Sequence, residues 1–171
     1  MPERNILAEE KIIQFEGLMD LRKVGATIYH WLKEHHYDMV ERVNFEQVFE
    51  EGKQIEVDME PMKKYGDYVR GKIRIRIWLT ELKEVEVDLN SVKRKLWKGK
   101  AKIEFTPILI TDVTDRWNES AAGFFFRTLI DKFLMKSQIS QAEGQCMSDC
   151  TAIMDEVKSL LNLYRFIPEN A

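Results

Sequence analysis

The sequence has little of what marks several classes of protein. Its 171 residues include only 8 Gly, 4 Pro and 2 Cys, too few for a collagen-like repeat or a disulfide-stabilised miniprotein. No apolar run reaches the ~18 residues of a membrane-spanning helix, and the N-terminus lacks the pattern of a secretion signal. We therefore expect a cytoplasmic protein without a membrane span.

Neither sign of charge is in large excess. Lys and Arg number 26, Asp and Glu number 29, and the net charge is −3. A chain with so small a net charge has no overall electrostatic attraction to nucleic acid, so we expect no nucleic-acid partner. Apolar residues make up 44%, which predicts a hydrophobic core and a single globular domain over residues 1–171.

Helical periodicity occurs at both ends of the chain. Apolar residues three and four apart predict a helix at about 8–36 and two more at about 120–136 and 141–164. A single helix from 120 to 164 would be roughly 65 Å long. Because Ser140 and Glu143 have the spacing of a capping box, we expect a kink or restart between Lys136 and Ser140.

Between these helices, at about 43–113, the apolar residues alternate with a period of two. The clearest example is Ile73, Ile75 and Ile77, separated by Arg74 and Arg76. About six strands are predicted, with 80–83 as a connection and 98–99 as a turn, and such short connections imply antiparallel pairing. On the first strand, Val43, Phe45 and Phe49 are expected on the apolar face.

Together these patterns predict a two-layer α+β fold. An antiparallel sheet of about six strands would be covered on one face by the N-terminal helix and a long, broken C-terminal helix. The other face would carry alternating acidic and basic strands in contact with solvent.

Three apolar residues are candidates for an interaction patch on the charged face. Trp78 continues the two-residue step of Arg74 and Arg76, so it is expected on the charged face. Ile108 and Ile110 are expected there as well if the last strand keeps its alternation. If Pro107 instead introduces a bulge, both isoleucines turn into the core. The run Phe124 to Phe126 covers more than half of a helix circumference, so Phe124 and Phe126 are further candidates.

No catalytic or metal-binding motif is present. The histidines His30, His35 and His36 lack the spacing of a zinc site. Cys146 and Cys150 share a helix face and are expected to be reduced core thiols. A cluster of Asp112, Asp115 and Glu119 has the character of a helix start. We therefore expect no cofactor and no metal, and nothing favours an enzyme.

The predicted strands at 43–113, followed by the helical region 120–164, resemble the helix-grip (START-like) superfamily in architecture. In that superfamily a long C-terminal helix crosses a curved antiparallel sheet, and a hydrophobic ligand occupies the space between them. Its members usually begin with a strand followed by short helices, whereas a long helix is predicted first here. Segments 29–37, 98–100 and 157–163 are also similar to small archaeal proteins, which implies no function.

Two functions follow as expectations. The first is a non-catalytic protein that binds a hydrophobic small molecule between the sheet and the C-terminal helix, with a pocket lined by Trp97, Phe105, Phe125, Leu129 and Phe133. The second is a protein-interaction module that uses the patch candidates to bind another protein or a second copy of the chain.

Overall fold

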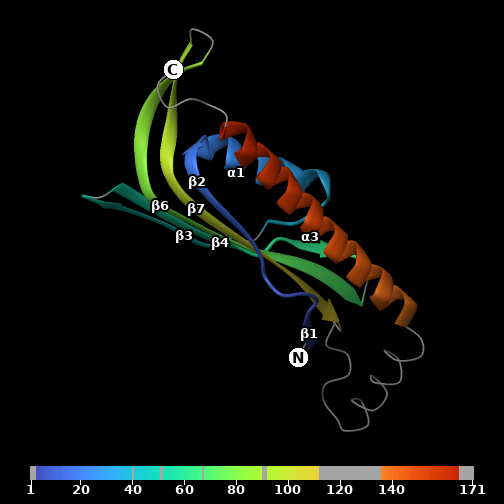
Figure 1. The fold of residues 1–171 in the computed structure, drawn as a ribbon. Helices are drawn as coiled ribbons and strands as arrows, with labels where there is room; N and C mark the ends of the chain where they lie inside the picture. Colours follow the sequence, from blue (N-terminus) through green and yellow to red (C-terminus); the bar gives the residue numbers. More distant parts are fainter. Residues whose placement is uncertain are drawn as a thin grey trace.

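A computed structural model describes residues 3–39, 41–50, 52–66, 68–89, 92–111 and 136–165. These residues form an α+β fold in which two helices lie on one face of a seven-stranded antiparallel sheet (Figure 1). The predicted fold class is confirmed, with seven strands in place of about six. In chain order the elements are β1 (Glu3–Ile6), β2 (Lys11–Met19), α1 (Leu21–Glu34), β3 (Glu41–Phe49), β4 (Gly52–Met59), β5 (Met62–Lys64), β6 (Val69–Leu89), β7 (Val92–Thr111) and α3 (Lys136–Tyr164).

Two long strands form the centre of the sheet. β6 pairs with β7 from Val69 opposite Thr111 to Leu89 opposite Val92. On one side β1 and β2 both pair with β7, and on the other side β4 and β5 both pair with β6. Among the described strands β3 pairs with β4 alone, so it forms an edge of the sheet.

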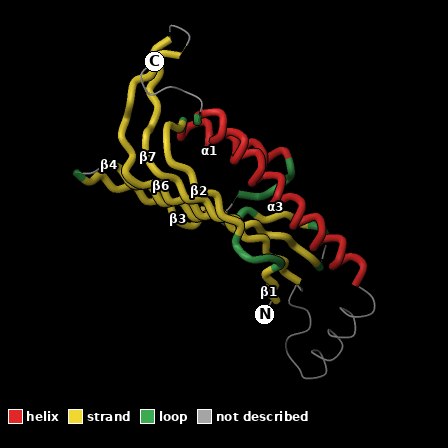
Figure 2. The backbone as a smooth tube through the Cα atoms, in the orientation of Figure 1, coloured by secondary structure: helices red, strands yellow, loops and turns green. Residues whose placement is uncertain are grey.

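The long strands curve strongly (Figure 2), and their pairing is interrupted by a bulge between Thr80 and Lys83. Glu81 has a φ of 56° there. Glycines let the neighbouring strands approach this bulge: a Cβ at Gly99 would lie 2.7 Å from the Thr80 carbonyl oxygen, and one at Gly52 would lie 2.9 Å from that of Leu82. A bulge bends its strand and increases the local twist.

The predicted connection at 80–83 and the predicted turn at 98–99 are therefore wrong, because both positions lie inside continuous strands. Sequence alternation breaks at a bulge much as it breaks at a turn, so the pattern alone does not distinguish the two. Past the bulge the expected opposite charges do face each other, with Glu86 opposite Lys95 and Asp88 opposite Lys93.

The core fills the space between the helices and the centre of the sheet. Ile73, Ile75, Ile103 and Phe105 point toward the helices and are fully buried. α3 covers this region with a helical stripe of buried residues: Cys146, Cys150, Ile153, Val157 and Leu161. α1 adds Val24, Ile28, Trp31 and Leu32. The residues that alternate with these along the strands, such as Arg74 and Arg76, lie on the outer face.

The predicted helix at 8–36 begins too early, because β2 occupies Lys11–Met19. Buried Ile13 and Phe15 alternate there with exposed Gln14 and Glu16, which is a strand period. The helix starts at Leu21 because the Asp20 carboxylate accepts hydrogen bonds from the backbone N–H groups of Arg22 and Lys23, at 3.1 and 3.2 Å. The chain thus begins with strands.

β3 presents the opposite faces from those predicted. Its register places Phe45 opposite Glu56 and Asn44 opposite Val57, so Phe45 lies on the outer, charged face. The hairpin sets this register by placing Phe49 opposite Gly52, and because opposed residues share a face, the faces of β4 decide those of β3.

The C-terminal helix also differs from the prediction. α3 runs without a break from Lys136 through Ser140 to Tyr164, so the predicted restart is wrong. Its 29 residues span about 44 Å at 1.5 Å per residue. The helix predicted at 120–136 lies outside the described residues, except for its last residue.

Gly99 lies so close to the bulge that an added methyl group should lower the stability of the fold. We expect Gly99→Ala to lower the free energy of unfolding by about 1–3 kcal/mol, because the added Cβ meets backbone atoms that cannot move aside easily. Gly144→Ala is the matched control: its Cβ would meet nothing within 4 Å, and an alanine in a helix should add about 0.5–1 kcal/mol. Denaturant unfolding measures both, and equal effects would contradict the close approach.

Candidate functional site

A buried carboxylate lies where α3 crosses β5. Asp149 is 7% exposed, and its Oδ2 accepts a hydrogen bond from the Tyr37 hydroxyl at 3.0 Å and from the Lys63 ammonium at 3.1 Å. The Tyr65 hydroxyl lies 3.4 Å from the same oxygen and 3.1 Å from the Tyr37 hydroxyl. We call these four residues the Asp149 cluster.

Short backbone links place the members of the cluster. Tyr37 follows α1, and its N–H donates to the Leu32 carbonyl at 2.9 Å. The next residue, Asp38, bridges to Met62 at the start of β5, which carries Lys63. Tyr65 can lie against β6 because position 71 is glycine: a Cβ there would overlap the Tyr65 ring and lie 3.2 Å from Cys146 Sγ.

The electrostatics of the cluster keep its phenols neutral. Burial raises the pKa of Tyr37 and of Tyr65 above the ordinary value, and the nearby Asp149 carboxylate adds to both shifts. Lys63 supplies the opposite charge and also lies 5.3 Å and 5.5 Å from the ring centroids of Tyr37 and Tyr65. At neutral pH the tyrosines are therefore hydrogen-bond donors and not bases.

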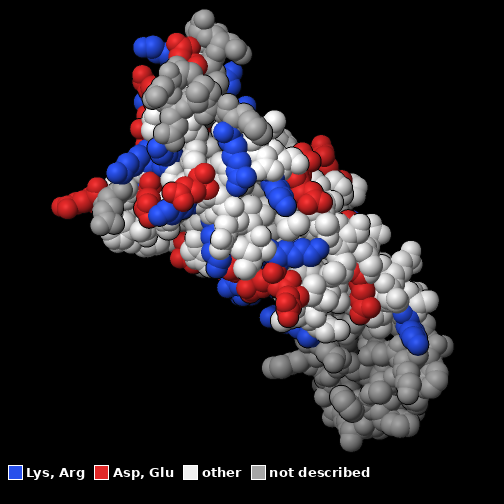
Figure 3. Space-filling model, in the orientation of Figure 1, with Lys and Arg blue, Asp and Glu red and all other residues white. Residues whose placement is uncertain are grey.

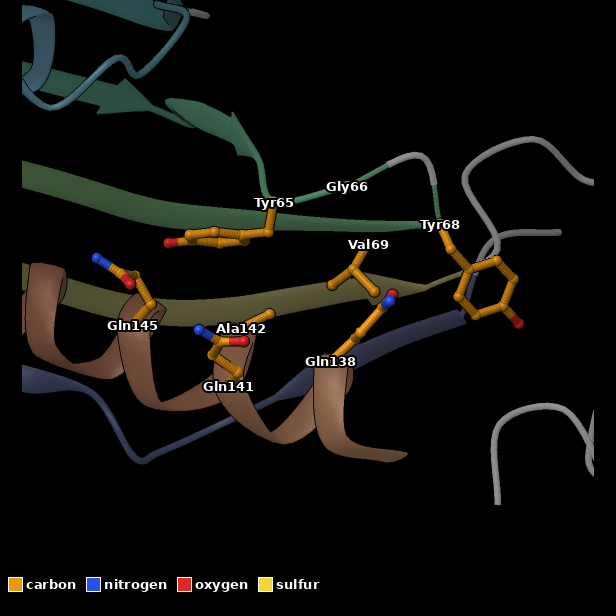
Figure 4. A pocket seen from close by; sticks show the side chains of 8 residues that line it. All are labelled: Tyr65, Gly66, Tyr68, Val69, Gln138, Gln141, Ala142 and Gln145. Carbon is orange, nitrogen blue, oxygen red and sulfur yellow. The ribbon is translucent and has the colours of Figure 1, made fainter. Parts of the chain in front are cut away.

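Next to this cluster lies an open cavity of about 620 Å³ between α3 and the start of β6. We call it the α3 cavity. Its lining residues are Tyr65, Gly66, Tyr68, Val69, Gln138, Gln141, Ala142 and Gln145 (Figure 4). The loop on the sheet side is closed by a hydrogen bond of 3.1 Å from the Tyr65 N–H to the Val69 carbonyl.

The lining combines apolar surface with neutral hydrogen-bonding groups. Tyr65 and Gln145 lie at one end, Tyr68 and Gln138 lie at the other, and Val69 and Ala142 lie between them (Figure 4). The glutamines follow a three- and four-residue spacing and so share one side of α3. None of the described lining residues carries a formal charge. The cavity suits a molecule with an apolar body and uncharged polar groups.

The structure describes two of the five predicted pocket residues, Phe105 and Trp97, and these two do not line one cavity. Phe105 is fully buried in the filled core, so it does not line an open cavity. Trp97 lies at the far bend of the sheet, where it lines a different cavity of about 670 Å³ with Arg22, Lys53 and Arg94. The remaining three candidates, Phe125, Leu129 and Phe133, lie outside the described residues.

The patch candidates on the sheet do lie on the outer face. The register continues unshifted past Pro107, with Lys72 opposite Ile108 and Arg70 opposite Ile110, so the alternative of a bulge at Pro107 is wrong. Trp78 is half-buried, with the Arg76 and Lys102 cations 5.2 Å from its ring centroids. Phe124 and Phe126 lie outside the described residues.

These outer-face candidates do not form one exposed patch. Ile110 is buried. Ile108 is opposite Lys72, and Lys72 lies six residues from Trp78 along β6. Six residues of strand span about 20 Å. On the face shown in Figure 3, acidic and basic side chains are interspersed over the described surface.

The outer face is instead a network of ion pairs. Lys72 Nζ lies 2.7 Å from Glu60, Arg74 pairs with Asp58 at 2.6 Å, and Glu104 contacts Lys102 at 2.7 Å. The hydrogen bond from Arg74 holds the pKa of Asp58 below its usual value. The Lys72–Glu60 and Arg74–Asp58 pairs connect β6 to β4 and to the residue that follows it, and cross-strand pairs of this kind support a sheet register. Lys102 and Glu104 pair within β7.

The described residues hold no cluster of metal ligands. No group of three or more His, Cys, Asp or Glu side chains is placed to hold a metal ion there. His35 stacks on Trp31 with ring centroids 3.8 Å apart, and its Nδ1 lies 2.8 Å from the Trp31 carbonyl oxygen. The candidates Asp112, Asp115 and Glu119 lie outside the described residues.

Sequence patterns do not predict the Asp149 cluster. One signal was available: Asp149 stands inside the apolar stripe of α3, beside Cys146 and Cys150, where a carboxylate needs partners. The partners themselves come from segments more than 80 residues away, and no periodicity connects them.

Comparison of the chain with protein-family models, with curated proteins and with solved structures finds no match to any of them. Within the described residues, neither helix combines the length and the apolar character that crossing a membrane requires.

The Asp149 cluster predicts a large loss of stability on truncation. We expect Asp149→Ala to lower the free energy of unfolding by about 2–4 kcal/mol, because it leaves the Lys63 charge and two phenols without their acceptor. Asp155→Ala, at an exposed position of the same helix, should change it by less than about 0.5 kcal/mol. Denaturant unfolding gives both values, and a small loss for Asp149→Ala would show that the cluster is not structural.

The two cysteines should be unreactive in the folded protein. Both are free and buried, and burial raises the pKa of Cys146 to about 12 and that of Cys150 to about 11. At about pH 8 we expect a thiol reagent such as DTNB to label neither, and to label both in guanidinium chloride. A Ser148→Cys variant, exposed on the same helix, should add one fast-reacting thiol. Rapid labelling of the native wild type would contradict the packing of α3.

Proposed function

We propose that this protein is a non-catalytic binding protein that holds a small molecule between its sheet and α3, in the α3 cavity. The observation that carries the proposal is the cavity itself. Its volume of about 620 Å³ lies in the range of small-molecule sites, roughly 300–1,000 Å³. It is located where the resemblance to the helix-grip superfamily implies a ligand.

The chemistry of the lining narrows the ligand. Tyr65, Tyr68, Val69 and Ala142 offer apolar contact, and three glutamines offer amide donors and acceptors. A charged ligand would lack a counter-charge among the described lining residues. The ligand we propose is therefore predominantly hydrophobic, with uncharged polar groups that the glutamines bind.

The order of elements also supports this proposal. Members of the helix-grip superfamily usually begin with a strand and then place short helices. With β2 in place of the first part of the predicted helix, the order of this chain becomes strands, helix, antiparallel strands and helix. We further place the protein in the cytoplasm, where the free thiols of Cys146 and Cys150 remain reduced.

The alternative, an interaction module built on Trp78, Ile108 and Ile110, has weaker support. Trp78 is covered in part by Arg76 and Lys102, Ile110 is buried, and the candidates are spread along the strands. A protein interface normally needs one continuous patch.

Binding of the neutral, hydrophobic dye Nile red tests the proposal, together with native mass spectrometry for a co-purified compound. Gln141 is exposed on the cavity side of α3, so Gln141→Trp should fill the cavity without disturbing the core. We expect this variant to weaken dye binding by at least about tenfold. Ser159→Trp, an exposed position about 27 Å further along the helix, is the matched control.

The control variant should bind the dye within about twofold of the wild type. Equal binding by all three proteins would place the dye elsewhere on the surface. That result, with no co-purified compound, would overturn the proposed site.

A further inference from the structure

The edge strand β3 is uncovered on both faces. Every one of its side chains that the structure describes is exposed, including Phe45 at 53%, Val48 at 75% and Phe49 at 44%. The edge on the other side of the sheet differs, because β2 buries Ile13, Phe15, Leu18 and Met19. Large apolar side chains on an open edge are a surface for pairing with another strand.

β3 has few of the features that protect natural sheet edges. Between Val43 and Phe49 its one charged residue is Glu46, which is paired with Lys53. The strand contains neither proline nor lysine, and its one irregularity lies at its start, between Glu41 and Val43. From Val43 to Phe49 the pairing with β4 is regular. The backbone groups on the open side are therefore extended and free to continue the sheet.

We propose that β3 pairs antiparallel with β3 of a second copy of this chain, about a two-fold axis at Gln47. In this register Gln47 faces Gln47 of the partner, and Phe45 faces the partner's Phe49. The two-fold axis generates the same contact a second time, so both exposed phenylalanines of each copy gain an aromatic partner. Aromatic cross-strand pairs are among the favourable contacts of antiparallel sheets.

The charges permit this arrangement. On the opposite face each Glu46 would face the partner's Val48, and the two Glu46 side chains would be diagonal neighbours. Lys53 Nζ lies 2.5 Å from Glu46 within the same copy, so each glutamate already has its counter-charge. No like-charged residues face each other directly between Phe45 and Phe49.

The helices leave room for a second sheet. Asn44, Glu46 and Val48 lie on the helix side of β3, opposite Val57, Ile55 and Lys53 of β4, and they are exposed. The helical layer therefore stops short of this edge. A second copy is favoured as occupant because the phenylalanine spacing is self-complementary, as a two-fold interface requires.

Cysteine cross-linking tests the register. Directly opposed residues of antiparallel strands have Cα atoms about 4.5–5.5 Å apart, so we expect Gln47→Cys to form a covalent dimer under mild oxidation by oxidised glutathione. Phe45→Cys is the matched control, because in this register the two Phe45 positions are about 14 Å apart. The native cysteines are buried and do not compete.

Charge substitution tests the contact without a cross-link. By light scattering and sedimentation we expect a wild-type dimer, a dissociation constant raised about tenfold by Phe45→Lys, and recovery in the double variant Phe45→Lys with Phe49→Glu, where the new opposite charges meet. A wild-type monomer at every concentration would overturn the proposal. So would a dimer that is unaffected by Phe45→Lys, or cross-linking of Phe45→Cys in preference to Gln47→Cys.

Discussion

The pairing of β6 with β7 is the interaction on which the rest of the structure depends. It runs from Val69 opposite Thr111 to Leu89 opposite Val92, and the other strands attach directly or through β4 to this pair. Because side chains alternate along a strand, one register decides which residues meet the helices and which meet solvent. The buried isoleucines of β6, the outer ion pairs and the floor of the α3 cavity all follow from it.

Glycines set the places where this long ladder departs from regular geometry. At the bulge, Gly52 and Gly99 admit the backbone of residues 80–82, and the pairing of the two long strands resumes beyond it. At Gly71 the missing side chain admits the Tyr65 ring beside Cys146. The first pair shapes the sheet, whereas Gly71 shapes the site, since Tyr65 both lines the cavity and reaches Asp149.

Sequence patterns predicted the parts of the fold that obey a single period. The alternation at Ile73, Ile75 and Ile77 correctly gave a one-sided sheet, and the helical spacing from Cys146 to Leu161 correctly gave its cover. Errors arose where two periods overlap or one is interrupted. Residues 12, 15 and 18 are three apart inside a strand, and the bulge at 80–83 imitates a turn. The Asp149 cluster could not be predicted, because its members meet through strand pairing between distant segments and follow no periodicity.

The division between a filled core and an open cavity follows from where α3 crosses the sheet. Over the centre, Cys146, Ile153 and Val157 belong with Ile75 and Phe105 to one buried hydrophobic cluster, and a void there would forfeit contacts on every side. Toward its first turns α3 presents glutamines, which do not drive the helix onto the sheet. The Asp149 cluster lies at the boundary between these two regions. Its ion pair and hydrogen bonds connect α3 to β5 and to the segment that follows α1, and its member Tyr65 also lines the cavity.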